Sequence, residues 1–154
     1  MELIMNDQRV NLSVLLIRCI TGLIFISEGI QKFAFPDALG IGRFIRIGIP
    51  FPGVLAPFVA SVEIICGLLV LAGLFTRYAA IPLVIVMLVA IMSTKFPILM
   101  SKGLWAMAHE ARTDFLMLIG MLSLLLTGGG RYSVDQKMGS YFKHPEAEKT
   151  ESRN

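Results

Sequence analysis

The feature that most constrains this chain is a set of long apolar segments, and the clearest of them contains a single charge. Residues 54–75 form a run of 22 residues in which Glu63 is the only charged member, and every other residue is apolar, small or proline. About 20 helical residues, rising ~1.5 Å each, cross a hydrocarbon core about 30 Å thick. A charge near the bilayer centre costs roughly 3 kcal/mol on insertion scales, so we expect Glu63 to face the protein interior.

The composition agrees with a membrane protein. The chain has 154 residues, of which 55% are hydrophobic and only 16% are charged, whereas soluble domains carry about 25% charged residues. The mean hydropathy is +0.73. We therefore predict an all-α integral membrane four-helix bundle, built from the apolar segments 12–34, 54–75, 78–96 and a fourth that ends at Thr127.

The fourth segment is short for a membrane span. Its uninterrupted part, residues 115–127, would cover only about 20 Å as a helix. Either the helix extends back through Asp114, Arg112 and Glu110, or it tilts in a locally thinned bilayer with those charges among the headgroups.

The connections between the segments differ in length. The second and third segments are joined by little more than Thr76 and Arg77, which predicts a tight helical hairpin, and Pro97 is expected to end the third segment. Residues 35–53 form a longer loop in which the amphipathic stretch 41–47 predicts a short interfacial helix or a re-entrant turn. Residues 97–109 form the other predicted loop.

The domain boundaries and the topology follow from the same segments. We predict one transmembrane domain over residues 1–135 and a polar, disordered tail over residues 136–154. The first segment carries Arg18 and Glu28 and is too long for a signal peptide, so we expect it to be retained. Four spans place both termini on one side, and we favour the cytoplasm, although the basic residues divide almost evenly between the two sides.

Charged residues from four helices fall at similar estimated depths. With the terminal side as zero, Glu28 lies at about 24 Å, Glu63 at about 18 Å, Lys95 at about 25 Å and Asp114 at about 20 Å. These four residues therefore form one predicted polar layer, in the half of the membrane away from the termini.

Two further cations belong to the predicted site. Lys32 follows Glu28 by four residues and so lies on the same helical face. Arg18 is shallower, at about 9 Å, but lies within roughly 80° of the same side of its helix. The layer is open to two interpretations, since its charges either pair to hold the helices together or form a polar pocket for a small molecule.

The sequence offers little support for a metal or haem site. His109 and His144 are the only histidines, one near a membrane end and one in the tail, and there is no Cys-x-x-Cys motif. Cys19 and Cys66 are interpreted as small apolar packing residues. We therefore expect no metal and no intrinsic cofactor.

Several motifs resemble the DoxX family. The run VEIICGLLVLAGLFTR at residues 62–77 is similar to that family's second-helix signature, and Arg18 with Gly22 and EGIQKF at 28–33 resemble its first helix. The run GGGRYSVD at 128–135 resembles the usual Gly-Pro-Gly-Arg-x-Ser-x-Asp, with glycine in place of proline. The resemblance covers about residues 12–135.

This resemblance implies a four-helix protein of the bacterial inner membrane. Family members are often described as oxidoreductases and are linked to thiosulfate:quinone oxidoreductase and to thiol and redox-stress systems, although many have no established reaction. Arg18, Glu28, Lys32 and Glu63 fall on the family's pattern positions, while Asp114 corresponds only approximately to its acidic residue in the fourth helix.

Our leading hypothesis is a membrane redox subunit that binds a quinone or similar small molecule in the polar layer. Glu63 and Glu28 would act catalytically by accepting or relaying protons, and the substrate-binding groups would be Arg18, Lys32, Lys95 and Asp114. Electrons would come from a redox partner protein, a membrane complex or the substrate.

The alternative hypothesis is a non-catalytic membrane scaffold or partner subunit of a larger complex, in which Ala56 and Ala60 allow close helix contact at the interface with a partner protein. A third hypothesis, small-molecule permeation, would require a homo-oligomer. The lipid bilayer is an expected partner under every hypothesis, and nucleic acid is not.

Overall fold

The structure is a computed structural model that describes residues 2–138, and the described part of the chain is helical with no β-strand. Its elements are α1 (Glu2–Ala34), α2 (Ile41–Arg46), α3 (Pro52–Ala72), α4 (Thr76–Ala90), the π-helix η1 (Ile91–Lys95), α5 (Phe96–Lys102) and α6 (Leu104–Thr127). Within residues 2–138, three helical stretches are long and apolar enough to cross a membrane: Gln8–Ala34, Pro52–Ala72 and Thr76–Lys102. The all-α prediction is confirmed for the described residues. Residues 136–138 of the tail that was expected to be disordered are helical, and residues 139–154 lie outside the described residues.

Helices α1 and α3 pack closely because small residues line their interface. A Cβ atom added to Gly29 would lie 2.6 Å from the Ala60 carbonyl oxygen, and one added to Gly22 would lie 3.0 Å from the Gly67 carbonyl oxygen. Ala56 and Ala60 are 2% and 0% exposed. Small residues bring membrane helices together, but here Ala56 and Ala60 do so inside the fold. The expectation that they serve a partner interface is therefore corrected.

The α3–α4 connection is a tight turn, as predicted, although its position differs by a few residues. Gly73, at φ +72°, ends α3, with its N–H donating to the Val70 carbonyl and the Leu74 N–H donating to the Leu69 carbonyl. This left-handed glycine is a common helix stop. The turn is Gly73 to Phe75, and Thr76 begins α4.

Helix α4 continues further than the sequence indicated. Pro97 lies in the first turn of α5, where a missing N–H is tolerated, so the prediction that it ends the third segment is wrong. The predicted loop at residues 97–109 is mostly helical, because α5 and α6 are separated only by Gly103, at φ +83°. Helix α6 extends back to Leu104, which places Glu110, Arg112 and Asp114 within it.

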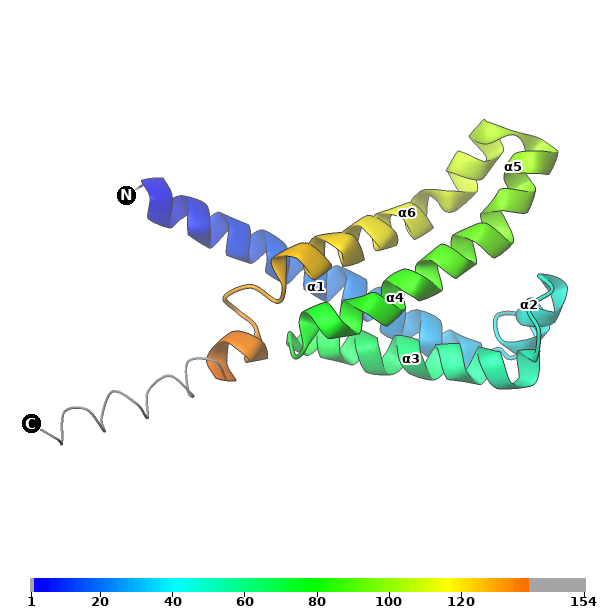
Figure 1. The fold of residues 1–154 in the computed structure, drawn as a ribbon, viewed down its shortest axis with the longest axis horizontal. Helices are drawn as coiled ribbons and strands as arrows, with labels where there is room; N and C mark the ends of the chain where they lie inside the picture. The colour runs from blue at the N-terminus through cyan, green and yellow to red at the C-terminus, as the bar shows by residue number, and fades with distance from the viewer. Residues whose placement is uncertain (1, 139–154) are drawn as a thin grey trace, which may run out of the picture.

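The helices form two pairs, α1 with α3 and α4 with α6, around a core that includes Phe25, Leu83, Met121 and Leu124. Figure 1 shows α3 and α4 joined at one end and diverging along their length, with α2 and α5 at the diverging end. The link between α3 and α4 and the segment after α6 lie at the other end. We call these the open end and the closed end.

Candidate functional site

A cavity of about 580 Å³ lies between the two helix pairs toward the open end. Small-molecule sites commonly measure about 300–1,000 Å³ and combine an apolar wall with a few polar groups. The apolar lining includes Phe25, Phe44, Phe58, Val59 and Met87. The charged lining comprises Glu28, Lys32, Arg43, Glu63, Lys95, Glu110 and Asp114. The cavity therefore has both properties of a small-molecule site.

On the α1–α3 wall, Lys32 connects two carboxylates. Its Nζ lies 2.6 Å from Glu63 Oε2 and 3.5 Å from Glu28 Oε2. The Glu63 side chain is 5% exposed and the Glu28 side chain 48%. These contacts form a line of ionisable groups from the molecular surface to the buried carboxylate. The prediction that Glu63 faces inward is confirmed.

On the opposite wall, Lys95 Nζ lies 3.1 Å from Asp114 Oδ2 and connects η1 to α6. Lys95 is the last residue of the π-helix, where the Ser93 and Thr94 hydroxyls donate to backbone carbonyls of the preceding turn. A π-turn re-aims the side chains that follow it and is frequent at functional sites. The π-helix therefore influences the direction in which the Lys95 side chain points into the cavity.

Arg43 and Glu110 also line the cavity, and sequence reasoning did not assign either to the site. Among the described residues, neither makes an ion pair within 4 Å. Arg43 lies on α2 next to Phe44, which is 7% exposed. The burial of Phe44 shows that α2 packs on the rest of the protein, and both Arg43 and Phe44 line the cavity. The amphipathic pattern of residues 41–47 could have indicated this, but it was interpreted as interfacial.

Arg18 does not lie with the other five predicted site residues. Its guanidinium is 2% exposed and donates to four backbone carbonyls at the closed end. Nε donates to Val70 (3.0 Å), Nη2 to Leu71 (2.9 Å), and Nη1 to Gly129 (2.7 Å) and Tyr132 (3.2 Å). The guanidinium thus donates to two carbonyls in the last turn of α3 and to two in the segment after α6, and so connects the two segments. The expectation that Arg18 binds the substrate is therefore corrected.

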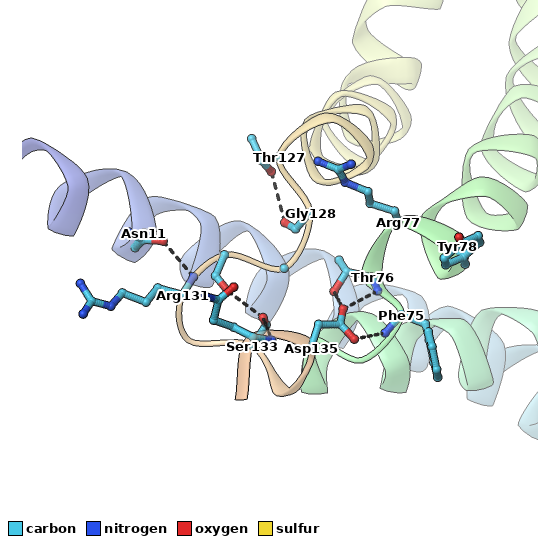
Figure 2. Close-up of a pocket in the computed structure, with 13 residues that line it drawn as sticks. Asn11, Phe75, Thr76, Arg77, Tyr78, Thr127, Gly128, Arg131, Ser133 and Asp135 are labelled. Atoms are coloured by element: carbon cyan, nitrogen blue, oxygen red, sulfur yellow. Dashed lines mark hydrogen bonds between the residues drawn. The ribbon is translucent and has the colours of Figure 1, made fainter. Parts of the chain in front are cut away.

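Further hydrogen bonds at the closed end connect the segment after α6 to α1 and to the start of α4 (Figure 2). Asp135 accepts from the Phe75 N–H at 2.7 Å and from the Thr76 N–H at 3.2 Å, and so caps α4. Asn11 Oδ1 accepts from the Arg131 N–H at 2.8 Å. A polar cleft of about 740 Å³ lies beside these contacts, but the contacts themselves connect segments of the fold.

Comparison with known proteins identifies the family of this chain. The family model described as DoxX matches residues 13–96. The chain belongs to the DoxX family. It is 52% identical over 132 residues to "Uncharacterized membrane protein Rv3486" of Mycobacterium tuberculosis, covering 82% of this chain and 81% of the relative. It is 32% identical over 124 residues to "Putative oxidoreductase CatD" of Bacillus subtilis, covering 80% and 85%. No solved structure matches the chain.

The DoxX motifs of this chain divide between two places in the structure. Glu28, Lys32 and Glu63 line the cavity at the open end. Arg18, the glycines at 128–130 and Asp135 connect helices at the closed end. One set of motif residues therefore surrounds a space that a ligand could occupy, and the other set forms contacts within the fold.

Proposed function

We propose that this DoxX family protein is a membrane redox subunit that binds a quinone or similar small molecule in the cavity between its two helix pairs. The proposal is based on the residues that line the cavity. Two separate ion-paired groups, Lys32 with Glu63 and Lys95 with Asp114, face one cavity with a largely apolar wall. The description of the Bacillus subtilis relative as an oxidoreductase supports the same class of activity.

The donor groups of the cavity suit a quinone. Quinone oxygens accept hydrogen bonds, and Lys32, Lys95 and Arg43 are donors on three different elements of the cavity wall. A bound quinone would supply two-electron chemistry coupled to proton uptake.

In this proposal Glu63 and Glu28 accept and release protons. Glu63 would hold a proton or release it at its buried carboxylate, which lies 2.6 Å from Lys32 Nζ. Glu28 is close to half-exposed and would exchange protons with the surroundings. Electrons would come from a redox partner protein or membrane complex, because the sequence carries no Cys-x-x-Cys or bis-histidine motif.

The proposal includes a four-span topology in the bacterial inner membrane, with both termini in the cytoplasm. Helix α6 has 24 residues and so covers about 36 Å, enough to cross. Its Asp114 is paired with Lys95, which lowers the cost of placing either charge at membrane depth. The three apolar helices together with α6 then give an even number of crossings.

Binding of a naphthoquinone to purified protein tests the proposal. We expect wild type to bind the quinone, measured by absorbance after equilibrium dialysis in detergent. Glu63→Gln should weaken binding by about tenfold or more while its thermal unfolding stays near that of wild type, because Lys32 retains Glu28 as a partner. Asp37→Asn is the matched control, since Asp37 lies outside the cavity lining.

Two outcomes would contradict the proposal. The first is a wild-type protein that binds no quinone. The second is a Glu63→Gln protein that binds as well as wild type. A Glu63→Gln protein that unfolds would instead favour the scaffold hypothesis, in which the carboxylate holds the bundle together.

A further inference from the structure

We infer that the ligand enters the cavity sideways from the bilayer, through a portal between α3 and α4, and is therefore an amphiphile whose long apolar tail remains in that portal. The inference rests on the proposed function and specifies its ligand class. A polar head would lie near Lys32, Glu63 and Arg43, and the tail would extend toward the lipid. The portal is defined by Phe58 on α3 with Ile85 and Val89 on α4.

The portal residues belong to the cavity wall and to the outer surface at once. Phe58, Ile85 and Val89 line the cavity, yet they are 61%, 55% and 51% exposed. All three lie on helices long and apolar enough to cross a membrane. Exposed apolar side chains on such helices face lipid tails. The cavity therefore opens toward the lipid where these residues lie.

The packing of α3 against α4 explains why the opening lies there. Near the closed end the two helices are held together by the short turn at Gly73 to Phe75, and Val70 and Leu83 are 0% exposed. Away from that turn the two helices diverge (Figure 1). Ile85 and Val89 are four residues apart and so share one face of α4 beyond that point. The opening is thus a consequence of two helices that are joined at one end only.

The chemistry of the lining changes across the cavity. The charges of Lys32 and Glu63 belong to α1 and to the inner face of α3, and Arg43 belongs to α2. The portal residues are wholly apolar. A small, fully polar substrate would gain nothing from an apolar opening, whereas an isoprenoid or acyl tail would be buried by it. The arrangement therefore fits a ligand with one polar head and one apolar tail.

A comparison of two ligands tests the portal. The probes are a methylnaphthoquinone and the same ring carrying a long isoprenoid tail, each measured by equilibrium dialysis against purified protein. In Val89→Trp the larger side chain narrows the opening, and we expect the affinity ratio of tailed to tailless ring to fall by about tenfold relative to wild type. Leu88→Trp is the matched control, because Leu88 is 47% exposed on the same helix but lies outside the cavity lining.

The outcomes separate the portal from the proposed function. A fall of the ratio in Val89→Trp with a wild-type ratio in Leu88→Trp supports the portal. If wild type binds both rings and the ratio is the same in all three proteins, the portal is overturned and quinone binding stands. If wild type binds neither ring, the proposed function itself fails. Ile85→Trp is a second variant and should lower the ratio in the same way.

Discussion

The closed end and the open end of this molecule use charged side chains in opposite ways. At the closed end, Arg18 is 2% exposed and donates to four backbone carbonyls from two separate parts of the chain. At the open end, Lys32, Glu63, Lys95 and Asp114 pair through side chains around a cavity. Backbone acceptors are fixed by the fold, whereas side-chain partners can rearrange toward a ligand. Burial of a charge therefore does not by itself identify a functional site.

The largest effect is expected from Arg18→Met. This change removes four hydrogen bonds from a charged donor, and the Leu71, Gly129 and Tyr132 carbonyls lose the donor that they have in the structure, each at a cost of about 1–3 kcal/mol. We expect the free energy of unfolding to fall by at least about 3 kcal/mol, measured by thermal unfolding in detergent. Arg18→Lys should lose less, although an ammonium cannot reproduce the planar fork of the guanidinium. An Arg18→Met protein as stable as wild type would contradict the structural role assigned to the closed end.

An intermediate effect is expected from Asp135→Ala, also at the closed end. The change removes the acceptor for the Phe75 and Thr76 N–H groups at the start of α4. Loss of a helix cap costs about 0.5–2 kcal/mol. Thermal unfolding should show this loss, and Asp135→Asn should retain part of the stability because an amide oxygen still accepts. Quinone affinity that fell along with stability would argue that the closed end contributes to the site.

The smallest effect on stability is expected from Lys95→Met at the open end. Polar contacts between membrane helices contribute ~0.6 kcal/mol on average, so the free energy of unfolding should change by about 1 kcal/mol or less. Quinone affinity should fall, because the variant removes a donor from the cavity wall. A large loss of stability with unchanged affinity would place the Lys95–Asp114 pair with the structural contacts of the closed end.

Much of the open end could be predicted from the sequence because helix geometry determines depth. Glu28, Glu63, Lys95 and Asp114 had similar estimated depths on four segments, and the structure brings all four to one cavity. The spacing of Glu28 and Lys32 was also informative, since residues four apart share a helical face.

The closed end was harder to predict because it depends on backbone groups and on contacts between distant segments. Arg18 was assigned to the site by its angle on the helix, although its estimated depth already separated it from Glu28. Nothing in the sequence around it indicated that its partners would be the carbonyls of Val70 and Gly129, 52 and 111 residues away. The continuation of the helix past Pro97 was missed for a similar reason, since the π-turn before it is a local rearrangement of backbone hydrogen bonds.

The closed end maintains the fold and the open end binds the ligand. Thermal unfolding of wild type, Arg18→Lys and Glu63→Gln, each with and without the tailed naphthoquinone, distinguishes these two roles. A ligand present at one hundred times its dissociation constant stabilises a protein by about 2.7 kcal/mol. We predict that Arg18→Lys unfolds at a lower temperature but keeps the ligand-induced shift. Glu63→Gln should unfold near wild type but lose about half of the shift or more, because a tenfold weaker affinity leaves about 1.4 kcal/mol of stabilisation at the same ligand concentration. The opposite pattern, or a full shift in Glu63→Gln, would contradict the claim.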